Sequence, residues 1–133
     1  MNILFLLTPK KEVDYLYGDF TVRQALEKMR ERRYSMLPVI DRKSGKYLRA
    51  IMEGDFLYYL AEKRYSFDEL ERHSLSEIPS NRLIQAVTID STIEQLYSTI
   101  SGQNFVPVID DNGIFIGIVT RKSVMKVLLS NVK

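Results

Sequence analysis

The chain of 133 residues carries one pattern twice, and this duplication limits its folds more than any other feature. Residues 12–57 and 83–125 contain the same succession: a β-like segment, a helix beginning at a threonine, an apolar strand with a proline, a turn with a glycine, a second strand and a helix start. The strands at 36–41 and 105–110 are the clearest copies, since both contain Pro-Val-Ile-Asp. We therefore expect two similar half-domains about a pseudo-two-fold axis, where a cleft would be a natural ligand site.

Composition argues against several classes of function. The net charge is only +2, from 19 basic and 17 acidic residues, which gives no electrostatic reason to expect binding to nucleic acid or a membrane. The sequence has no cysteine, which excludes disulfides, thiolate metal sites and cysteine nucleophiles and fits a reducing compartment. We expect the protein in the cytoplasm.

The first seven residues are apolar but do not resemble a targeting segment. They lack the basic start and the small-residue cleavage site of a signal peptide. They are also far shorter than the about 20 residues that span a bilayer. We expect them to form a buried strand or clamp.

Two helices are predicted by a capping box followed by an apolar stripe. Thr21 and Gln24 form the first box and Thr92 and Gln95 the second. The apolar residues recur at i, i+3, i+4 and i+7 after each threonine, which is typical of an amphipathic helix. Ser66 and Glu69 offer a third box, which predicts a connecting helix at 66–73.

Each of these two helices leads into a predicted hairpin. The strands are expected at 35–40 with 47–52 and at 104–109 with 114–119, and final helices at about 54–63 and 121–130. Pro38 and Pro107 lie within the first strand of each hairpin. Because proline cannot donate a ladder hydrogen bond, it is expected at an edge or a bulge.

With this order established, the chain resembles a tandem pair of CBS motifs, often called a Bateman module, over about residues 8–129. The Pro-Val-Ile-Asp strands carry the resemblance, together with the segment 117–123, which is similar to the family's Gly-hydrophobic-hydrophobic-Thr/Ser-x-x-Asp signature. The resemblance implies an α+β fold of two tandem β-α-β-β-α motifs packed about a pseudo-two-fold axis. Residues 1–133 would be one module, with repeats at about 8–63 and 79–130.

Such modules, by resemblance, bind adenosine-containing ligands in clefts between the two repeats. The signature Thr/Ser and Asp contact phosphate or ribose, and backbone groups of the linker and strand read the adenine. A helix N-terminus suits phosphate, because its unpaired amides carry roughly half a positive charge.

The resemblance implies a first cleft that combines repeat one with the signature of repeat two. Its candidate residues are Thr8, Val13, Ser35, Met36, Thr120, Arg121, Lys122 and Ser123. The hydroxyl at Thr120 is kept, whereas Ser123 stands where the family usually has Asp. We expect this cleft to favour a phosphate-rich ligand.

A second cleft would combine the linker and strand of repeat two with the helix start of repeat one. Its candidate residues are Arg82, Ile84, Gln85, Phe105, Val106 and Asp55. Asp55 holds the ribose position, but Met52 replaces the signature threonine and Arg49 the glycine. Glu53 would also repel a phosphate.

The segment Thr120-Arg121-Lys122 looks like the second signature of stand-alone CBS pairs that bind cyclic di-adenosine monophosphate (c-di-AMP). This resemblance makes c-di-AMP one expected ligand, beside AMP, ADP and ATP. The simpler interpretation stays open: Thr120 is only a helix cap, worth about 1 kcal/mol, and the two cations are solvated.

Two functions follow as hypotheses. The first is a regulatory module that binds an adenine nucleotide and signals to a separate effector protein. The alternative is a degenerate CBS pair that serves as a dimerisation scaffold without ligand. Apolar residues of the two final helices favour a homodimer in either case.

We expect no enzymatic activity. A catalytic nucleophile needs a partnered base, and the sequence has only one histidine and no cysteine. No Gly-rich phosphate loop or metal-ligand spacing is present in the sequence, so no metal and no resident cofactor are expected.

Overall fold

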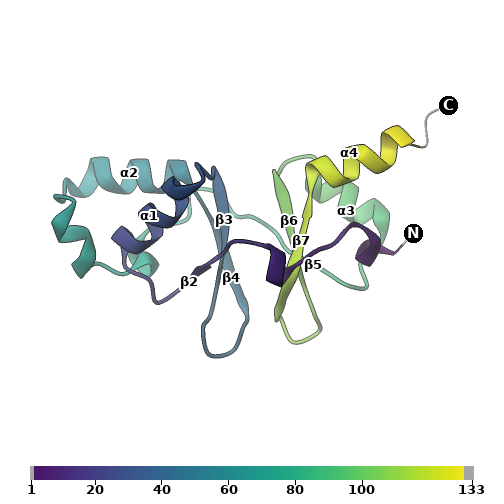
Figure 1. Cartoon of the computed structure of the whole chain (residues 1–133), viewed down its shortest axis with the longest axis horizontal. Helices are drawn as coiled ribbons and strands as arrows, with labels where there is room; N and C mark the ends of the chain where they lie inside the picture. The colour runs from purple at the N-terminus through teal and green to yellow at the C-terminus, as the bar shows by residue number, and fades with distance from the viewer. Residues whose placement is uncertain (1, 131–133) are drawn as a thin grey trace. The chain divides into compact units, whose positions relative to one another are not determined.

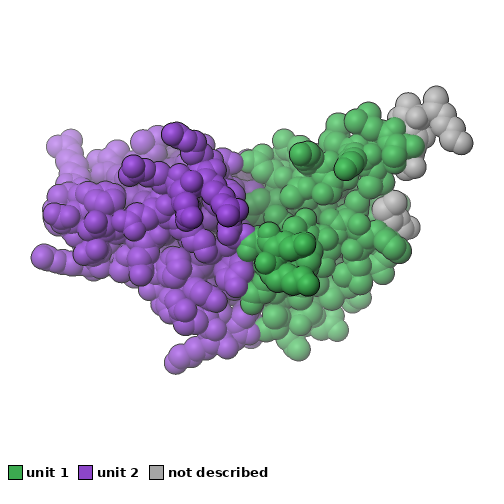
Figure 2. Space-filling view, viewed as in Figure 1, with its two compact units in different colours: residues 1–13, 84–133 green, residues 14–83 purple. Residues whose placement is uncertain are grey.

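The structure is a computed structural model that describes residues 2–130. The chain divides into two compact units (Figure 2): unit 1 comprises Met1–Val13 with Ile84–Lys133, and unit 2 comprises Asp14–Leu83. The N-terminal segment therefore belongs with the second repeat. The repeat boundaries expected from the sequence stay a prediction.

Unit 2 contains a three-stranded sheet in the order β2-β3-β4 (Figure 1). β2 (Leu16–Tyr17) is parallel to β3 (Met36–Ile40), and β3 is antiparallel to β4 (Tyr47–Met52). The helices are α1 (Val22–Glu31), α2 (Glu53–Lys63) and the 3-10 turns η3 (Asp68–Arg72) and η4 (Leu75–Glu77). Side chains of α1, α2 and one face of the sheet form a single core, with Leu16, Ala25 and Ile51 fully buried.

Unit 1 repeats this order and adds a strand. Its sheet has the order β1-β7-β6-β5, with β5 (Val87–Thr88) parallel to β6 (Phe105–Ile109) and β6 antiparallel to β7 (Phe115–Thr120). The helices are α3 (Ile93–Ile100) and α4 (Arg121–Ser130). β1 (Thr8–Pro9) comes from the N-terminal segment and pairs antiparallel with the outer side of β7. The predicted β-α-β-β-α order is thus confirmed in both repeats.

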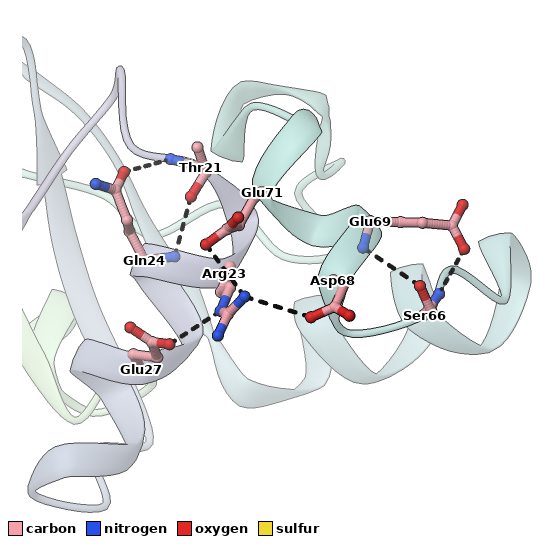
Figure 3. Close-up of polar contacts among 8 residues, drawn as sticks. All are labelled: Thr21, Arg23, Gln24, Glu27, Ser66, Asp68, Glu69 and Glu71. Atoms are coloured by element: carbon pink, nitrogen blue, oxygen red, sulfur yellow. Dashed lines mark hydrogen bonds and ion pairs between the residues drawn. The ribbon is translucent and has the colours of Figure 1, made fainter.

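The helix starts follow the sequence signals closely. The Thr21 hydroxyl accepts from the Gln24 amide at 3.1 Å while the Gln24 side chain accepts from the Thr21 amide at 2.9 Å (Figure 3). Thr92 and Gln95 repeat this box at 3.1 and 2.8 Å. Ser66 and Glu69 form the third box (Figure 3), although the segment that follows is the short 3-10 turn η3.

Arg23 ties α1 to η3 within unit 2. Its guanidinium lies 3.1 Å from Glu27, 3.6 Å from Asp68 and 3.1 Å from Glu71 (Figure 3). Because these carboxylates are exposed, the pairs contribute little each, and they mainly fix the position of η3 against the helix.

The prediction for the strand prolines was only partly right. Pro38 and Pro107 lie in β3 and β6, each of which has a neighbour on both sides. The parallel neighbour pairs only from the next residue, Val39 or Val108, so neither proline faces a ladder partner on that side. A register shift follows directly, between residues 39 and 40 and between 108 and 109.

The N-terminal segment was predicted to form a buried strand or clamp, and of these two it is not a strand. Ile3–Leu6 form the 3-10 turn η1, in which Asn2 Oδ1 accepts from the Leu4 amide. Ile3 and Leu6 are buried in the core of unit 1, so the segment does clamp that unit. A second turn, η2 (Lys10–Glu12), follows β1. None of the helices formed by residues 2–130 has the length and apolar character needed to cross a membrane.

Candidate functional site

The start of α4 carries the hydroxyl that the resemblance singles out. Thr120 is the last residue of β7, and its Oγ1 accepts from the Ser123 amide at 3.1 Å. The Ser123 hydroxyl lies 2.8 Å from the same oxygen. Thr120 therefore caps the helix. The Arg121 amide donates to the Asn104 carbonyl and the Ser123 amide to Thr120, so the helix dipole, more than free amides, favours an anion beside the two hydroxyls.

The two cations that follow differ in their environment. Arg121 Nη2 donates to the Gln103 carbonyl at 2.8 Å. Its side chain also lines a pocket of about 400 Å³ with apolar residues of α3 and α4, among them Tyr97 and Val124. Lys122 is exposed and has no hydrogen bond or ion pair with any residue of 2–130. Lys122 is thus the cation free to meet a ligand.

Thr8 and Val13 belong to the same unit as this helix start. Thr8 pairs with Ile118 and Pro9 with Gly117, two and three residues before Thr120. The approach is so close that a Cβ on Gly117 would lie 2.2 Å from the Thr8 carbonyl oxygen. The structure thus brings Thr8 beside the signature segment, in the unit of the second repeat, and its role in a ligand site stays a prediction.

The remaining first-cleft residues lie in unit 2. Met36 is the first residue of β3, and the Ser35 carbonyl accepts from the Glu53 amide at 3.0 Å. Their participation in one site with Thr120 stays a prediction.

The start of α2 is built differently. Asp55, in the first turn of α2, has a buried carboxylate that is only 1% exposed. It accepts from the Met52 amide at 2.9 Å, from the Asn81 amide at 3.2 Å and from Asn81 Nδ2 at 3.0 Å. Arg49 Nη2 lies 3.3 Å away. Asp55 therefore fastens the helix start and the segment around Asn81 to one another.

Arg49 is the second unusual residue of this region. Its Nη1 donates to the Ile78 carbonyl, while its Nε is buried without a partner among residues 2–130. Burial lowers the pKa of the Arg49 guanidinium, and the nearby Asp55 carboxylate opposes this change. Arg49 thus occupies, with a large charged side chain, a position that the signature reserves for glycine.

The other predicted residues of the second cleft lie around β6 in unit 1, except Arg82, which is exposed in unit 2. Val106 points into the helix-side core and is fully buried. Phe105 lies next to it in β6, on the opposite face of the strand. Ile84 is buried and Gln85 is exposed.

Gln103 and Asn81 are polar residues that sequence reasoning missed. Gln103 is only 8% exposed, and its carboxamide bonds to both backbone groups of Gln85. A polar residue two positions before an apolar strand was the available signal, but its partner lies 18 positions away and could not be read from spacing. Among residues 2–130, no group of three His, Cys, Asp or Glu side chains could hold a metal ion.

Comparison with known proteins adds three solved structures. CbpB in complex with c-di-AMP is 25% identical, with a TM-score of 0.88, over 98% of this chain and 85% of that chain. CbpB from Streptococcus agalactiae is 26% identical, with a TM-score of 0.83, over 94% of this chain and 78% of that chain. A hypothetical conserved protein from Geobacillus kaustophilus is 28% identical, with a TM-score of 0.86, over 99% of this chain and 98% of that chain.

The comparison with curated proteins gave no match. The family model for the CBS domain matches twice, at residues 6–62 and 75–130, which together make up most of the chain. Each match contains one β-α-β-β-α unit and one of the two helix starts described above. This chain therefore belongs to the CBS domain family, as a tandem pair of its repeats.

Proposed function

We propose that this protein is a cytoplasmic regulatory module that binds an adenosine-containing nucleotide, with c-di-AMP as the first candidate and AMP, ADP and ATP as the others. The observation that carries the proposal is the similarity to CbpB, solved with c-di-AMP, over 98% of this chain. The α4 start supports it, since it combines a capped helix N-terminus, two hydroxyls and the unpaired Lys122.

Each part of this helix start has a role toward a nucleotide. The positive end of the α4 helix dipole and the Lys122 ammonium would neutralise a phosphate. The hydroxyls of Thr120 and Ser123 would bond to phosphate or ribose oxygens. Binding would change the relation of the repeats only through a difference in affinity between two arrangements, and a separate effector protein would read that change.

Thermal unfolding with AMP, ADP, ATP, S-adenosylmethionine and c-di-AMP tests the proposal. A ligand at 100 times its dissociation constant adds about 2.7 kcal/mol of stability. We expect c-di-AMP to raise the melting temperature by several degrees. An unchanged melting temperature across the whole panel would contradict nucleotide binding, and turnover of any nucleotide would contradict a regulatory role.

Two matched pairs of variants localise the site. Lys122→Met should weaken nucleotide binding about tenfold or more, whereas Lys126→Met, one turn later on the exposed surface of α4, should leave it unchanged. Thr120→Ala should lose about 1 kcal/mol of stability together with affinity. Thr92→Ala removes the equivalent cap of α3 and should lose stability alone.

The scaffold function remains the second candidate, and the exposed apolar side chains of α2 and α4 favour it. Leu57 and Met125 hold the same place in the two helices and are 63% and 49% exposed. Tyr58 and Leu129 are also exposed. We propose that a second copy covers these faces in a homodimer.

Sedimentation analysis of Leu57→Glu with Met125→Glu tests this part. The wild type should sediment as a dimer and the double variant as a monomer with an unchanged circular dichroism spectrum. A wild type that sediments as a monomer, or a double variant of dimer mass, would contradict the dimer. A dimer that binds no nucleotide would favour the scaffold over the regulatory module.

A further inference from the structure

A hollow of about 400 Å³ lies within unit 2, between the loop after β2, the β3–β4 hairpin and the turn η4. The apolar residues that line it are Val39, Leu48 and Leu75. Its lining includes none of the residues predicted to bind a nucleotide. The hollow is therefore a feature of unit 2 that the proposed function does not use.

A bulge in β4 shapes one wall of this hollow. The register shift after Val39 makes Leu48 an extra residue of its strand, and such bulges re-aim a side chain. Leu48 reaches across to the loop after β2, since a Cβ on Gly18 would lie 2.7 Å from Leu48 Cδ1. In unit 1 the bulged residue is Ile116, which packs against the core there, whereas Leu48 is 53% exposed. The bulge of unit 2 thus leaves an apolar wall uncovered.

Two carboxylates line the hollow and differ in their partners. Asp19 accepts at both oxygens from Arg42, at 2.7 and 3.0 Å. Asp41 accepts from the amide and the hydroxyl of Ser44, at 2.8 and 2.7 Å, and within residues 2–130 it forms no ion pair. The bonds from Ser44 lower the pKa of the Asp41 carboxyl, so this group is ionised at neutral pH.

The third charged residue of the lining is already neutralised. Arg49 Nη2 lies 3.3 Å from Asp55 Oδ2. Since Asp19 is paired with Arg42 and Arg49 with Asp55, the charge of Asp41 is left unbalanced. The hydrogen bond from Arg42 lowers the pKa of Asp19 and the charge of Asp41 opposes this change, so the two carboxylates are close enough to interact. The hollow therefore combines apolar walls with one net negative charge.

This combination selects the chemistry of a ligand. An ammonium group would form a charge-assisted hydrogen bond with Asp41. An apolar group on the same molecule would cover Leu48 and Leu75 and remove their surface from water. A carboxylate in place of the ammonium would be repelled, and a bare metal ion would leave the apolar wall exposed.

We propose that the hollow of unit 2 binds a small organic ammonium ion, with its nitrogen at Asp41 and its apolar group against Val39, Leu48 and Leu75. This site goes beyond the proposed nucleotide binding and does not depend on it. Because Leu75 and Ser76 belong to η4, the ligand would also fasten η4 to the sheet, in the segment that leads to unit 1.

An NMR titration of the whole chain with isoamylamine tests the inference. We expect the amide signals of Gly18, Leu75 and Ser76 to shift. Isocaproate has the same branched chain with a carboxylate in place of the amine, and it should bind at least about tenfold more weakly, a difference of about 1.4 kcal/mol. Isoamyl alcohol carries no charge, and its affinity should fall between the two.

Variants of the lining place the ammonium group. Asp41→Asn keeps an oxygen for Ser44 and should weaken isoamylamine binding about fivefold, the effect of losing a partly exposed ion pair. Asp110→Asn is the matched control, because Asp110 accepts from amides of the equivalent turn in unit 1, and it should leave binding unchanged. If Asp41→Asn fails to fold, Ser76→Trp serves instead. Ser76 is exposed and bonds to Ser74, and the larger side chain should cover the hollow and abolish binding.

Isoamylamine that shifts no amide of the lining would overturn the inference, as would an isocaproate affinity equal to that of isoamylamine. Binding that Asp41→Asn leaves unchanged would overturn the place of the ammonium group. The proposed function fails by a different sign, namely a nucleotide panel that leaves the melting temperature unchanged.

Discussion

The starts of α2 and α4 hold the same place in the two repeats, yet different side chains cap them. At α4, the Thr120 hydroxyl accepts from the Ser123 amide. At α2, the residue in the place of Thr120 is Met52, and the carboxylate of Asp55 reaches back to the Met52 amide. A capping box has two reciprocal hydrogen bonds, and each of these helix starts has one of them. Only at α4 do the polar groups that form this bond lie near the surface.

The strands before these helices also differ, at one pair of equivalent residues. Gly117 in β7 and Arg49 in β4 pair with equivalent residues of the neighbouring strand, Val108 and Val39. Gly117 leaves room for β1 to approach, whereas the Arg49 side chain extends to Asp55 and the Ile78 carbonyl. The comparison indicates that the α2 start serves stability, whereas the polar groups of the α4 start stay near the surface, where we propose that a ligand binds.

Replacing Asp55 should have the largest effect on stability. Asp55→Ala leaves the partly buried Arg49 charge and two backbone amides without this acceptor, and breaking a buried charge pair costs up to about 3–5 kcal/mol. Ser123→Ala changes the equivalent residue of α4 and should cost less than about 1 kcal/mol, since its hydroxyl meets only Thr120. Urea unfolding measures both, and equal losses would contradict the division of roles.

Gly117→Ala should come second. Its Cβ would lie 2.2 Å from the Thr8 carbonyl oxygen, so β1 must move away from β7, at a cost of about 1–3 kcal/mol. Gly54→Ala in α2 is the matched control: its Cβ meets only Tyr58 at 3.8 Å, and alanine favours a helix by roughly 0.5–1 kcal/mol. Amide exchange that is unchanged at residues 3–8 in Gly117→Ala would show that the approach of β1 does not depend on the glycine.

Ser123→Asp should change the stability by a smaller amount and should raise it. A carboxylate in the first turn of α4 gains about 0.3–1 kcal/mol from the helix dipole. It also restores the residue by which the signature would read ribose, so nucleotide affinity should rise. Calorimetry with AMP checks this, and a loss of affinity would indicate that a phosphate occupies the position instead.

Alkaline pH should lower the stability of unit 2 through Tyr59 and leave the equivalent place in unit 1 unaffected. Burial, with a hydrogen bond to Glu77, raises the pKa of Tyr59 to about 12. A raised pKa means that the folded state holds its proton more tightly, so this contribution is full below about pH 10 and is lost as pH rises toward 12. The equivalent residue of α4 is Val127, which does not titrate.

Tyr59→Phe should therefore flatten the fall in unfolding free energy between pH 10 and pH 12. Urea unfolding at pH 8, 10 and 11 measures it. A variant that loses stability with the same slope as wild type would exclude Tyr59 as a cause.

Much of the fold was predictable, because its signals are local. A threonine three residues before a glutamine specifies a helix start through two short hydrogen bonds, and both predicted boxes of α1 and α3 are present. The strand bounds 47–52 were predicted to the residue, since a turn precedes the strand and a helix start follows it directly. For the N-terminal segment, the clamp was predicted rightly and the strand wrongly, because a short apolar run fits a strand and a 3-10 turn equally well.

The candidate site was predictable only in part. The resemblance pointed to Thr120 and Asp55, and the structure finds both at helix starts. The sequence could not show that Asp55 would form hydrogen bonds with Asn81, 26 positions away, or that Gln85 would form them with Gln103, 18 positions away. Such bonds depend on which loops meet after the chain has folded.

The sequence by itself determined the duplication, the order of elements in each repeat and the helix caps, because these follow from periodicity and from contacts within four residues. The tertiary structure alone decided that residues 1–13 join the second repeat, that Gly117 admits β1, and that the polar groups of Asp55 and Gln85 are already satisfied. Buried hydrogen bonds between distant segments form only where packing brings donor and acceptor together, and no local pattern encodes that meeting.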